Sequence, residues 1–264
     1  MLLAVDVGNT QTVLGLLEDE PADAADGLVA HWRLETNAAH TSDELFLLVH
    51  QLLALSGKDL ATGIGGVAIS STVPRVRSAW EEMARAHLDA PTVVVGPGLD
   101  TGMAIAYHRP EDVGADRIAN AVAARDRYGT PVIVVDFGTA TTFDAIAADG
   151  AYLGGAIVPG VEVSLEALFA RASLLGRVEL TEPVAAIGRS TAEAIRSGTF
   201  FGFAAQADGL CRCFLDELGS ARVVATGGLG GLIAPHCRTI ETYDPWLTLH
   251  GLRILFRRNA ERSA

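Results

Sequence analysis

Two short segments of the chain combine an aspartate, a glycine and small polar side chains directly after an apolar run. Residues 6–12 read DVGNTQT and residues 136–142 read DFGTATT. Such a glycine lets a turn bring backbone N–H groups close to a polyanion, and the small side chains add donors without filling the space. An aspartate at a strand end can hold Mg²⁺ through water. Each segment taken alone is equally typical of an ordinary hairpin turn.

The spacing of the two segments favours the phosphate-binding interpretation. Asp6 and Asp136 are 130 residues apart, close to half of the 264-residue chain. A motif that recurs at half the chain length indicates a duplicated domain. Two such turns that face each other across a cleft would grip a phosphate chain from both sides. The chain has no Gly-x-x-x-x-Gly-Lys-Ser/Thr sequence, so a nucleotide would have to be held in some such way.

A third segment, residues 225–231 (ATGGLGG), is rich in glycine and follows a strand-like run. A strand that leads into a glycine-rich helix start leaves backbone open to a flat ligand such as adenosine. The alternative is a tight strand-to-helix turn with no ligand. After two phosphate-type turns, the order of the three segments favours the nucleotide interpretation.

A fourth segment, residues 107–121, places an acid and a base side by side where a helix begins. Asp116 and Arg117 are these two residues. A kinase that acts on an alcohol needs a carboxylate to accept the hydroxyl proton and a cation near the acidic substrate or the transferring phosphate. The alternative is that Asp116 only stabilises the helix N-terminus while Arg117 bonds elsewhere.

The elements that must position these segments follow from hydrophobic periodicity and capping signals. In each half, a strand hairpin and a third strand precede helices, which predicts an α/β fold class. The prediction is two duplicated domains, residues 1–112 and 113–264, each a mixed sheet with helices, with a cleft between them. Residues 96–110 are expected to form a loop or hinge. Residues 257–262 are expected to be a frayed helix end. The expected strands are 2–7, 12–17, 28–34, 66–70, 92–95, 131–143 (a hairpin), 152–159 and 222–225, and the expected helices are 41–56, 76–88, 113–128, 191–218 and 247–258.

Composition narrows the class of protein. Hydrophobic residues make up 49% of the chain and charged residues 20%, too apolar for disorder. The formal net charge is −12 and no Lys/Arg-rich run occurs, so nucleic acid is not expected as a partner. No apolar run approaches the roughly 20 residues that span a bilayer, so no membrane is expected. Three sparse cysteines, Cys211, Cys213 and Cys237, indicate reduced thiols packed in a cytoplasmic protein.

The first three segments, in this order and spacing, resemble the phosphate-1, phosphate-2 and adenosine segments of the actin, hexokinase and Hsp70 superfamily, whose domains have a ribonuclease H-like fold. The resemblance covers nearly the whole chain but does not identify a substrate. The fourth segment is more specific, because residues 114–121 (GADRIANA) look like type III pantothenate kinases. Residues 188–198 and 244–252 also follow the pattern of that family.

The family resemblance implies an activity and a set of roles. The reaction is ATP plus pantothenate giving 4′-phosphopantothenate, the first step of coenzyme A biosynthesis, with Mg²⁺ and a monovalent cation (K⁺ or NH₄⁺) as cofactors. Asp116 becomes the catalytic proton acceptor, and Asp136 becomes the ligand of the monovalent cation. The family is homodimeric, with the pantothenate pocket partly formed at the subunit interface. The implied ATP-binding residues are Asp6, Val7, Gly8, Asn9, Thr10, Gln11, Thr12, Val13 and Thr139, and the implied pantothenate-binding residues are Tyr107, Gly114, Ala115, Asp116, Arg117 and Thr191.

Two other functions are compatible with the superfamily. One is a kinase for another substrate, such as a sugar or acetate, which the GADR segment and the short chain disfavour. The other is a binding or regulatory module without catalysis, which the presence of Asp6, Asp116 and Asp136 disfavours. A panel of substrates with ATP would separate the first from pantothenate kinase, and absence of phosphoryl transfer in potassium buffer would favour the second.

Overall fold

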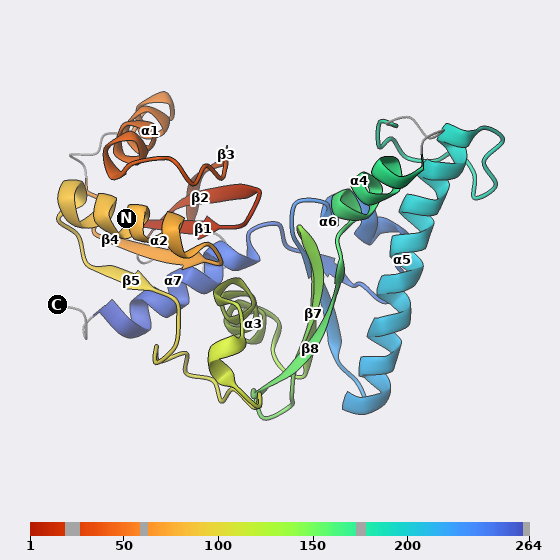
Figure 1. Ribbon diagram of the computed structural model, residues 1–264. Coiled ribbons are helices and arrows are strands. Elements are labelled where there is room, and N and C mark those ends of the chain that lie inside the picture. Colours follow the sequence, from red (N-terminus) through yellow and green to blue (C-terminus); the bar gives the residue numbers. More distant parts are fainter. Residues whose placement is uncertain (19–26, 59–62, 173–177, 261–264) are drawn as a thin grey trace. The chain divides into compact units, whose positions relative to one another are not determined.

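The computed structural model describes residues 1–18, 27–58, 63–172 and 178–260, and it divides into two compact units (Figure 1). Unit 1 comprises Met1–Arg127 and Leu247–Ala264, and unit 2 comprises Tyr128–Trp246. Each unit contains one five-stranded mixed sheet. The two units are described separately below.

Unit 1 is built on a sheet with the strand order β3-β2-β1-β4-β5. Strands β1, β2 and β3 pair antiparallel, whereas β4 lies parallel to β1 and β5 lies parallel to β4. The strands are β1 Leu2–Val7, β2 Gln11–Leu17, β3 Leu28–Glu35, β4 Gly66–Ser71 and β5 Thr92–Val94. The helices are α1 Ser42–Leu55, α2 Pro74–Met83 and α3 Ala115–Tyr128, with α7 Leu247–Asn259 from the end of the chain.

Both faces of the unit 1 sheet are covered, which explains the continuous apolar run in β1. Leu3 and Val5 lie in a core with the buried side chains of α1 and α2. Helix α7 packs against β1 and β4, and Figure 1 shows it on the side of the sheet away from α1. Successive side chains of a strand point to opposite faces, so Leu2 and Ala4, both fully buried, face α7.

Glycines allow α7 to approach its neighbours closely. A side chain at Gly15 on β2 would meet Leu249 of α7 at 2.7 Å, and one at Gly66 on β4 would collide with the ring of Phe256. On α7 itself, a side chain at Gly251 would collide with the backbone carbonyl of Ala119 in α3. Helix α7 is therefore enclosed between the sheet and α3.

Unit 2 repeats the sheet of unit 1, with the strand order β10-β9-β6-β7-β8. Strands β6, β7 and β8 are antiparallel, and β9 and β10 add in parallel. Its core joins β6 to the buried side of the long helix α5 through Phe137, Phe200 and Ala204. Its strands are β6 Val132–Phe137, β7 Ala140–Ile146, β8 Tyr152–Pro159, β9 Arg222–Thr226 and β10 Thr242–Tyr243, and its helices are α4 Val161–Arg171, α5 Thr191–Leu218 and α6 Gly230–Ile233.

The repetition extends to irregular details. The second and third strands of each unit share a register shift at the same place, between Leu16 and Leu17 in unit 1 and between Ala145 and Ile146 in unit 2. The strand registers pair Val7 with Thr12 but Phe137 with Thr141, so the second turn is one residue shorter. The duplicated fold is therefore confirmed, but the constant spacing of 130 residues holds only up to the turn and becomes 129 after it.

The units differ from the expected division at residues 112 and 113. Helices α3 and α7 follow the expected boundary in sequence, yet nearly all of α3 and all of α7 lie in unit 1. The reason is tertiary packing on the first sheet, which sequence order does not reveal. The sequence also missed α4 and β10. Strand β1, strand β8 and helix α5 have the expected bounds.

The end of α7 corrects another expectation. Residues 257–260 belong to an ordered helix end rather than a frayed one, and Asn259 is only 4% exposed. Glu261 and Arg262 lie outside the described residues. In the part of the chain that the structure describes, no helix is both long enough and apolar enough to cross a bilayer.

Candidate active site

The turn that carries the first candidate segment is closed by the end of the third strand. In unit 1, the N–H of Gly8 donates to the carbonyl of Gln11 at 3.0 Å, and the N–H of Thr36 donates to the carbonyl of Thr10 at 2.9 Å. The Thr36 hydroxyl donates to the carbonyl of Gly8 at 2.8 Å and shares a 2.9 Å hydrogen bond with the hydroxyl of Thr12. These bonds make the turn a defined structure, in which the N–H and the carbonyl of Gly8 are both hydrogen-bonded within unit 1.

The second candidate turn is closed in the same way. The N–H of Gly138 donates to Ala140 at 3.1 Å, and the N–H of Gly160 donates to the carbonyl of Thr139 at 3.2 Å. A side chain at Gly160 would collide with the carbonyls of Gly138 and Thr139. Gly160 is also the N-cap of α4 and has no side-chain cap. Thr139 therefore lies beside a helix N-terminus, whose N–H groups favour anions.

The glycine-rich segment lies directly against Asp136 within unit 2. Gly227 has φ +90°, and a side chain there would collide with the carboxylate of Asp136 and the backbone of Phe137. The N–H of Leu229 donates to the carbonyl of Phe137 at 3.2 Å, and the hydroxyl of Tyr243 donates to the carbonyl of Gly227 at 3.0 Å. Asp136 is also paired across the sheet with Thr226. The second and third candidate segments are thus brought together by adjacent parallel strands.

Asp116 lies on the first turn of α3, as the sequence predicts. Its Oδ1 accepts the N–H of Arg117 at 2.8 Å, and a side chain at Gly114 would come within 2.5 Å of that oxygen. The helix-stabilising role considered from the sequence is therefore present. It does not exclude chemistry, because an ionised carboxylate has about four acceptor sites on two oxygens. Arg117 is 7% exposed and Tyr107 is 36% exposed.

Helix α7 links the strand of Asp6 to the helix of Asp116. The hydroxyl of Thr248, in the first turn of α7, donates to Oδ1 of Asn120 in α3 at 2.7 Å. The next residue, Leu249, contacts Gly15, which pairs with Ala4 of β1. Asn120 and Thr248 were not singled out from the sequence, because only the return of α7 to unit 1 gives them a role.

Thr191 is the first residue of α5, and its placement is defined by capping. The hydroxyl of Ser190 accepts the N–H of Glu193 at 3.3 Å, and the Glu193 carboxylate accepts the N–H of Arg189 at 2.7 Å. A pocket of about 790 Å³ lies next to this helix start. Its lining consists of residues 182–189, Glu193 and Arg196, so Thr191 itself is not among the lining residues.

The cysteines show no sign of a metal site. Within the described ranges, no group of three or more His, Cys, Asp or Glu side chains is placed to hold a metal ion. All three thiols are free, and burial is the main reason why the pKa of Cys211 is raised to about 11 and that of Cys237 to about 12. These two thiols stay protonated near neutral pH.

Solved structures resemble this chain in fold. A glucokinase of the ROK family from Streptomyces griseus, in complex with glucose and AMPPNP, matches with a TM-score of 0.55 at 12% identity and covers 97% of this chain and 99% of its own. A Campylobacter jejuni protein described as a Baf family transcriptional activator matches with a TM-score of 0.58 at 19% identity, covering 98% and 99%. These similarities support the actin-like fold, with its two mixed sheets, and nothing finer.

Sequence comparison identifies the family. A protein of Streptomyces avermitilis named type III pantothenate kinase is 48% identical over 100% of both chains, and one of Anaeromyxobacter is 49% identical over 98% of this chain and 100% of its own. The family model for type III pantothenate kinase matches residues 2–213. With the duplicated sheets, the paired turns and the Asp116–Arg117 helix start in place, the chain belongs to the type III pantothenate kinase family.

Proposed function

We propose that this chain transfers the γ-phosphoryl group of ATP to the primary hydroxyl of pantothenate, producing 4′-phosphopantothenate for coenzyme A biosynthesis. The observation that carries the proposal is the position of Asp116 in a chain of this family. It lies at the start of α3, in the same unit as the Asp6 turn and linked to it through α7. The proposed catalytic carboxylate and one proposed phosphate-binding turn thus belong to the same unit.

ATP would be held by residues 6–13 of the first turn and by Thr139 of the second. The fit is supported by the backbone of both turns. In each turn the glycine N–H donates to a carbonyl just after the turn, and a side chain at Gly160 would collide with the carbonyls of Gly138 and Thr139. Mg²⁺, which kinases of this family use, supplies charge neutralisation for the phosphate oxygens. Asp6 is the residue that would hold it through water.

The reaction needs three contributions from the chain. Tyr107, Gly114, Ala115 and Thr191 would bind and orient pantothenate. The carboxylate of Asp116 would accept the proton of the substrate hydroxyl as the new P–O bond forms. The guanidinium of Arg117 would bind the pantothenate carboxylate or the transferring group. Since the chemistry of phosphoryl transfer is mostly positioning and charge stabilisation, a rigid helix start is a suitable place for these groups.

Asp136 is proposed as the ligand of a monovalent cation, K⁺ or NH₄⁺. Its carboxylate lies close to the backbone of the glycine-rich segment, because a side chain at Gly227 would collide with Asp136 Oδ1. Carboxylate and carbonyl oxygens suit such cations. The homodimer and the cytoplasmic location that the sequence suggests stay proposals as well.

The direct test is phosphorylation of pantothenate by ATP and Mg²⁺ in potassium buffer, compared with sodium buffer. We expect product in potassium or ammonium and much slower turnover in sodium. Glucose and acetate serve as control acceptors and should consume no ATP. Equal turnover in sodium would contradict only the proposal that Asp136 binds a monovalent cation. No phosphorylation of pantothenate in any buffer would contradict the proposed kinase function.

A further inference from the structure

The connection between β5 and α3 carries several of the proposed substrate-binding residues. It runs from residue 95 to residue 114, includes Tyr107 and Gly114, and ends where α3, the helix of Asp116, begins. Its one described helical turn is the short 3₁₀ turn Pro110–Asp112. A connection of this length has a large conformational entropy unless side chains anchor it. The position of its substrate-binding part therefore depends on where it is fastened.

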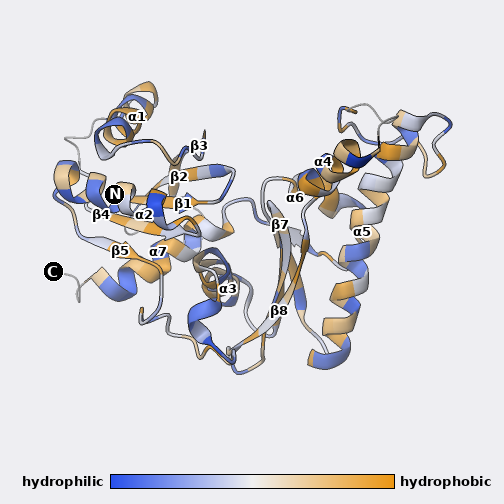
Figure 2. Ribbon diagram, in the orientation of Figure 1, coloured by the Kyte–Doolittle hydropathy of each residue, from blue (hydrophilic) through white to orange (hydrophobic). Residues whose placement is uncertain are grey.

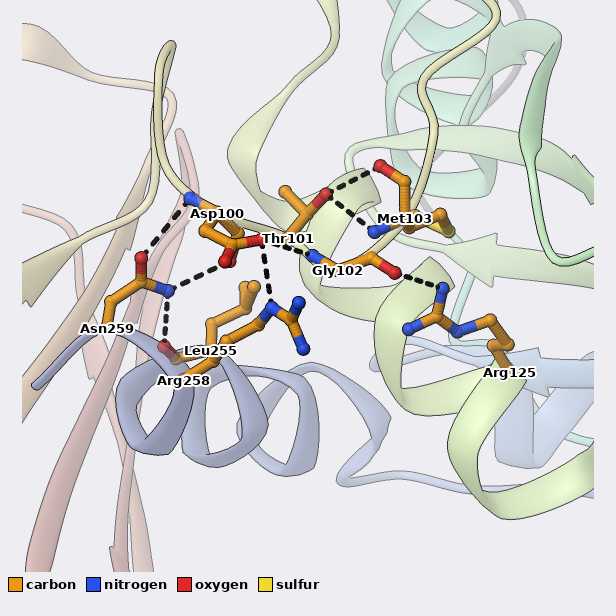
Figure 3. Close-up of polar contacts among 8 residues, drawn as sticks. All are labelled: Asp100, Thr101, Gly102, Met103, Arg125, Leu255, Arg258 and Asn259. Carbon is orange, nitrogen blue, oxygen red and sulfur yellow. Dashed lines mark hydrogen bonds and ion pairs between the residues drawn. The ribbon is translucent and has the colours of Figure 1, made fainter.

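One anchor is a pair of hydrogen bonds from a single side chain to a single backbone unit (Figure 3). The Oδ1 of Asn259, the last residue of α7, accepts the N–H of Asp100 at 3.2 Å, and its Nδ2 donates to the carbonyl of Asp100 at 2.9 Å. The same Nδ2 donates to the carbonyl of Leu255 at 2.8 Å, which fixes the amide against its own helix. Asn259 is 4% exposed, so these bonds form away from competing water.

The side chain of Asp100 strengthens this anchor. Its Oδ1 accepts the N–H of Gly102 at 2.9 Å and the Nε–H of Arg258 at 2.9 Å. Gly102 has φ +63°, and a side chain there would come within 2.6 Å of the Arg258 guanidinium. Thr101 completes the turn, because its hydroxyl donates to the carbonyl of Met103 at 2.9 Å. The turn is thus shaped to fit the end of α7.

A second anchor comes from α3. The guanidinium of Arg125 donates to the carbonyl of Gly102 at 2.8 Å (Figure 3). Arg125 and Asp116 are on the same helix, roughly 14 Å apart at 1.5 Å per residue. The chain therefore leaves the anchored turn, passes Tyr107, enters α3 at Gly114 and returns to the same turn through Arg125. Both ends of the substrate-binding segment are fastened.

From this geometry we infer that Asn259 is a positioning residue for pantothenate: it fixes the turn at Asp100 to α7 and so sets where Tyr107 and the Gly114–Arg117 helix start lie. The inference rests on the proposed function. It extends that function by giving a residue outside the proposed binding site a role in binding pantothenate but not ATP. The residues proposed for ATP lie on the hairpin turns of β1–β2 and β6–β7, outside this connection.

The test is Asn259→Asp, which keeps the size of the side chain and the acceptor for the Asp100 N–H. It replaces the donor by an oxygen that faces the carbonyls of Asp100 and Leu255. We expect the KM for pantothenate to rise about tenfold, the ratio typical of a lost buried hydrogen bond. The KM for ATP should stay within about twofold. The residues proposed to bind ATP lie outside this connection, so its displacement should weaken the binding of pantothenate only.

One control variant and one matched pair separate positioning from stability. Val49→Ala removes buried volume from α1, far along the chain from this connection, and should lower Tm without changing either KM. Gly102→Ala and Gly98→Ala impose the same type of backbone strain in one loop, at φ +63° and +87°. A side chain at Gly98 meets nothing within 4 Å, whereas one at Gly102 meets Arg258. Gly102→Ala should therefore displace the Arg258 guanidinium from Asp100 and give a smaller rise in the KM for pantothenate, whereas Gly98→Ala should leave that KM unchanged.

The outcomes are distinct. A pantothenate-specific rise in KM for Asn259→Asp and Gly102→Ala supports the inference. Equal changes in both KM values, or a fall in Tm with both KM values unchanged, would assign Asn259 a structural role only and overturn it. If the unmodified chain does not phosphorylate pantothenate, the proposed function has failed and the inference fails with it.

Discussion

The carboxylate of Asp116 already accepts a backbone hydrogen bond, and this bond determines how the side chain is oriented. Its Oδ1 accepts the N–H of Arg117, which fixes the rotation of the side chain at the helix start. A fixed carboxylate loses little conformational entropy when substrate binds. A well-oriented proton acceptor therefore lowers the reaction barrier more than a mobile one does. The bond that looks merely structural therefore assists the proposed catalysis.

Replacing Asp116 by Asn tests that role. The amide oxygen can still accept the Arg117 N–H, so the helix start should persist, but the side chain can no longer take a proton. We expect kcat to fall by about 10²–10⁴, the usual contribution of a general base, with unchanged Tm. Steady-state kinetics measures kcat, thermal unfolding measures Tm, and ATP titration shows whether nucleotide binding survives. Asp112→Asn, a nearby exposed carboxylate, is the matched control and should keep near-normal kcat.

A fall in kcat of less than about fivefold for Asp116→Asn would show that another group accepts the proton, since general bases typically contribute far more. A large fall accompanied by lost ATP binding would instead mean that the substitution disturbs the helix.

At the scale of elements, α7 organises unit 1. It covers one face of the sheet, contacts α3 and ends at the turn of Asp100. Three close approaches, at Gly15, Gly66 and Gly251, let it fit between the sheet and α3. The alignment of Asp6, Asp116 and the substrate segment thus depends on one helix that the chain adds last.

Gly251→Ala should disrupt this arrangement. The added methyl group would collide with the backbone carbonyl of Ala119, which cannot rotate away as a side chain could. Overpacking of this kind typically costs about 1–3 kcal/mol in the free energy of unfolding, so Tm should fall despite the better helix propensity of alanine. Thermal unfolding measures it. Gln51→Ala on the exposed side of α1 is the control and should leave Tm unchanged or raise it slightly; an equal or higher Tm for Gly251→Ala would contradict the close packing.

At the scale of the whole molecule, the exposed side of α5 is unusual. Figure 2 shows hydrophobic residues interleaved with hydrophilic ones along the whole helix. Gly198, Gly202 and Ala205 are exposed on one stripe beside Phe201, which is 37% exposed. A side chain at either glycine would meet nothing within 4 Å. Each helical glycine costs about 1 kcal/mol relative to alanine, and this chain gains nothing from it. The homodimer proposed above offers a reason, because glycine would let a second copy approach closely.

Gly202→Glu tests the proposed dimer. The glutamate fits the single chain and improves helix propensity, but it would place a charge in a dimer interface. We expect the unmodified chain to have twice the 27.6 kDa chain mass in light scattering after size exclusion, and the variant to have the single-chain mass. Gln51→Glu introduces the same residue on an exposed helix of unit 1 and should leave the mass unchanged. A dimeric Gly202→Glu variant would exclude this stripe from the interface.

The sequence by itself determined the repeated unit and its chemistry. The apolar run before DVGNTQT and DFGTATT required a buried strand, the Asp-x-Gly spacing required a turn, and the recurrence near half the chain length required two copies. Thr41 with Glu44 defined a capped helix start, which the structure shows as a capping box. These are local properties, decided by residue type and by neighbours within a few positions. For the same reason the GADR segment was enough to predict Asp116 as the proton acceptor.

Only the tertiary structure decided which parts of the chain meet. The sequence shows α7 as a helix after the glycine-rich segment at residues 225–231. It does not show that this helix packs on the first sheet, since a helix face does not specify the surface that covers it. Asn259 illustrates this. Its position at the end of the last helix predicts fraying, yet its side-chain amide donates to the backbone carbonyl of Asp100, 159 positions earlier. Contacts over such distances depend on the packed arrangement of whole elements, because a single asparagine carries no local signal for a partner so far away in the chain.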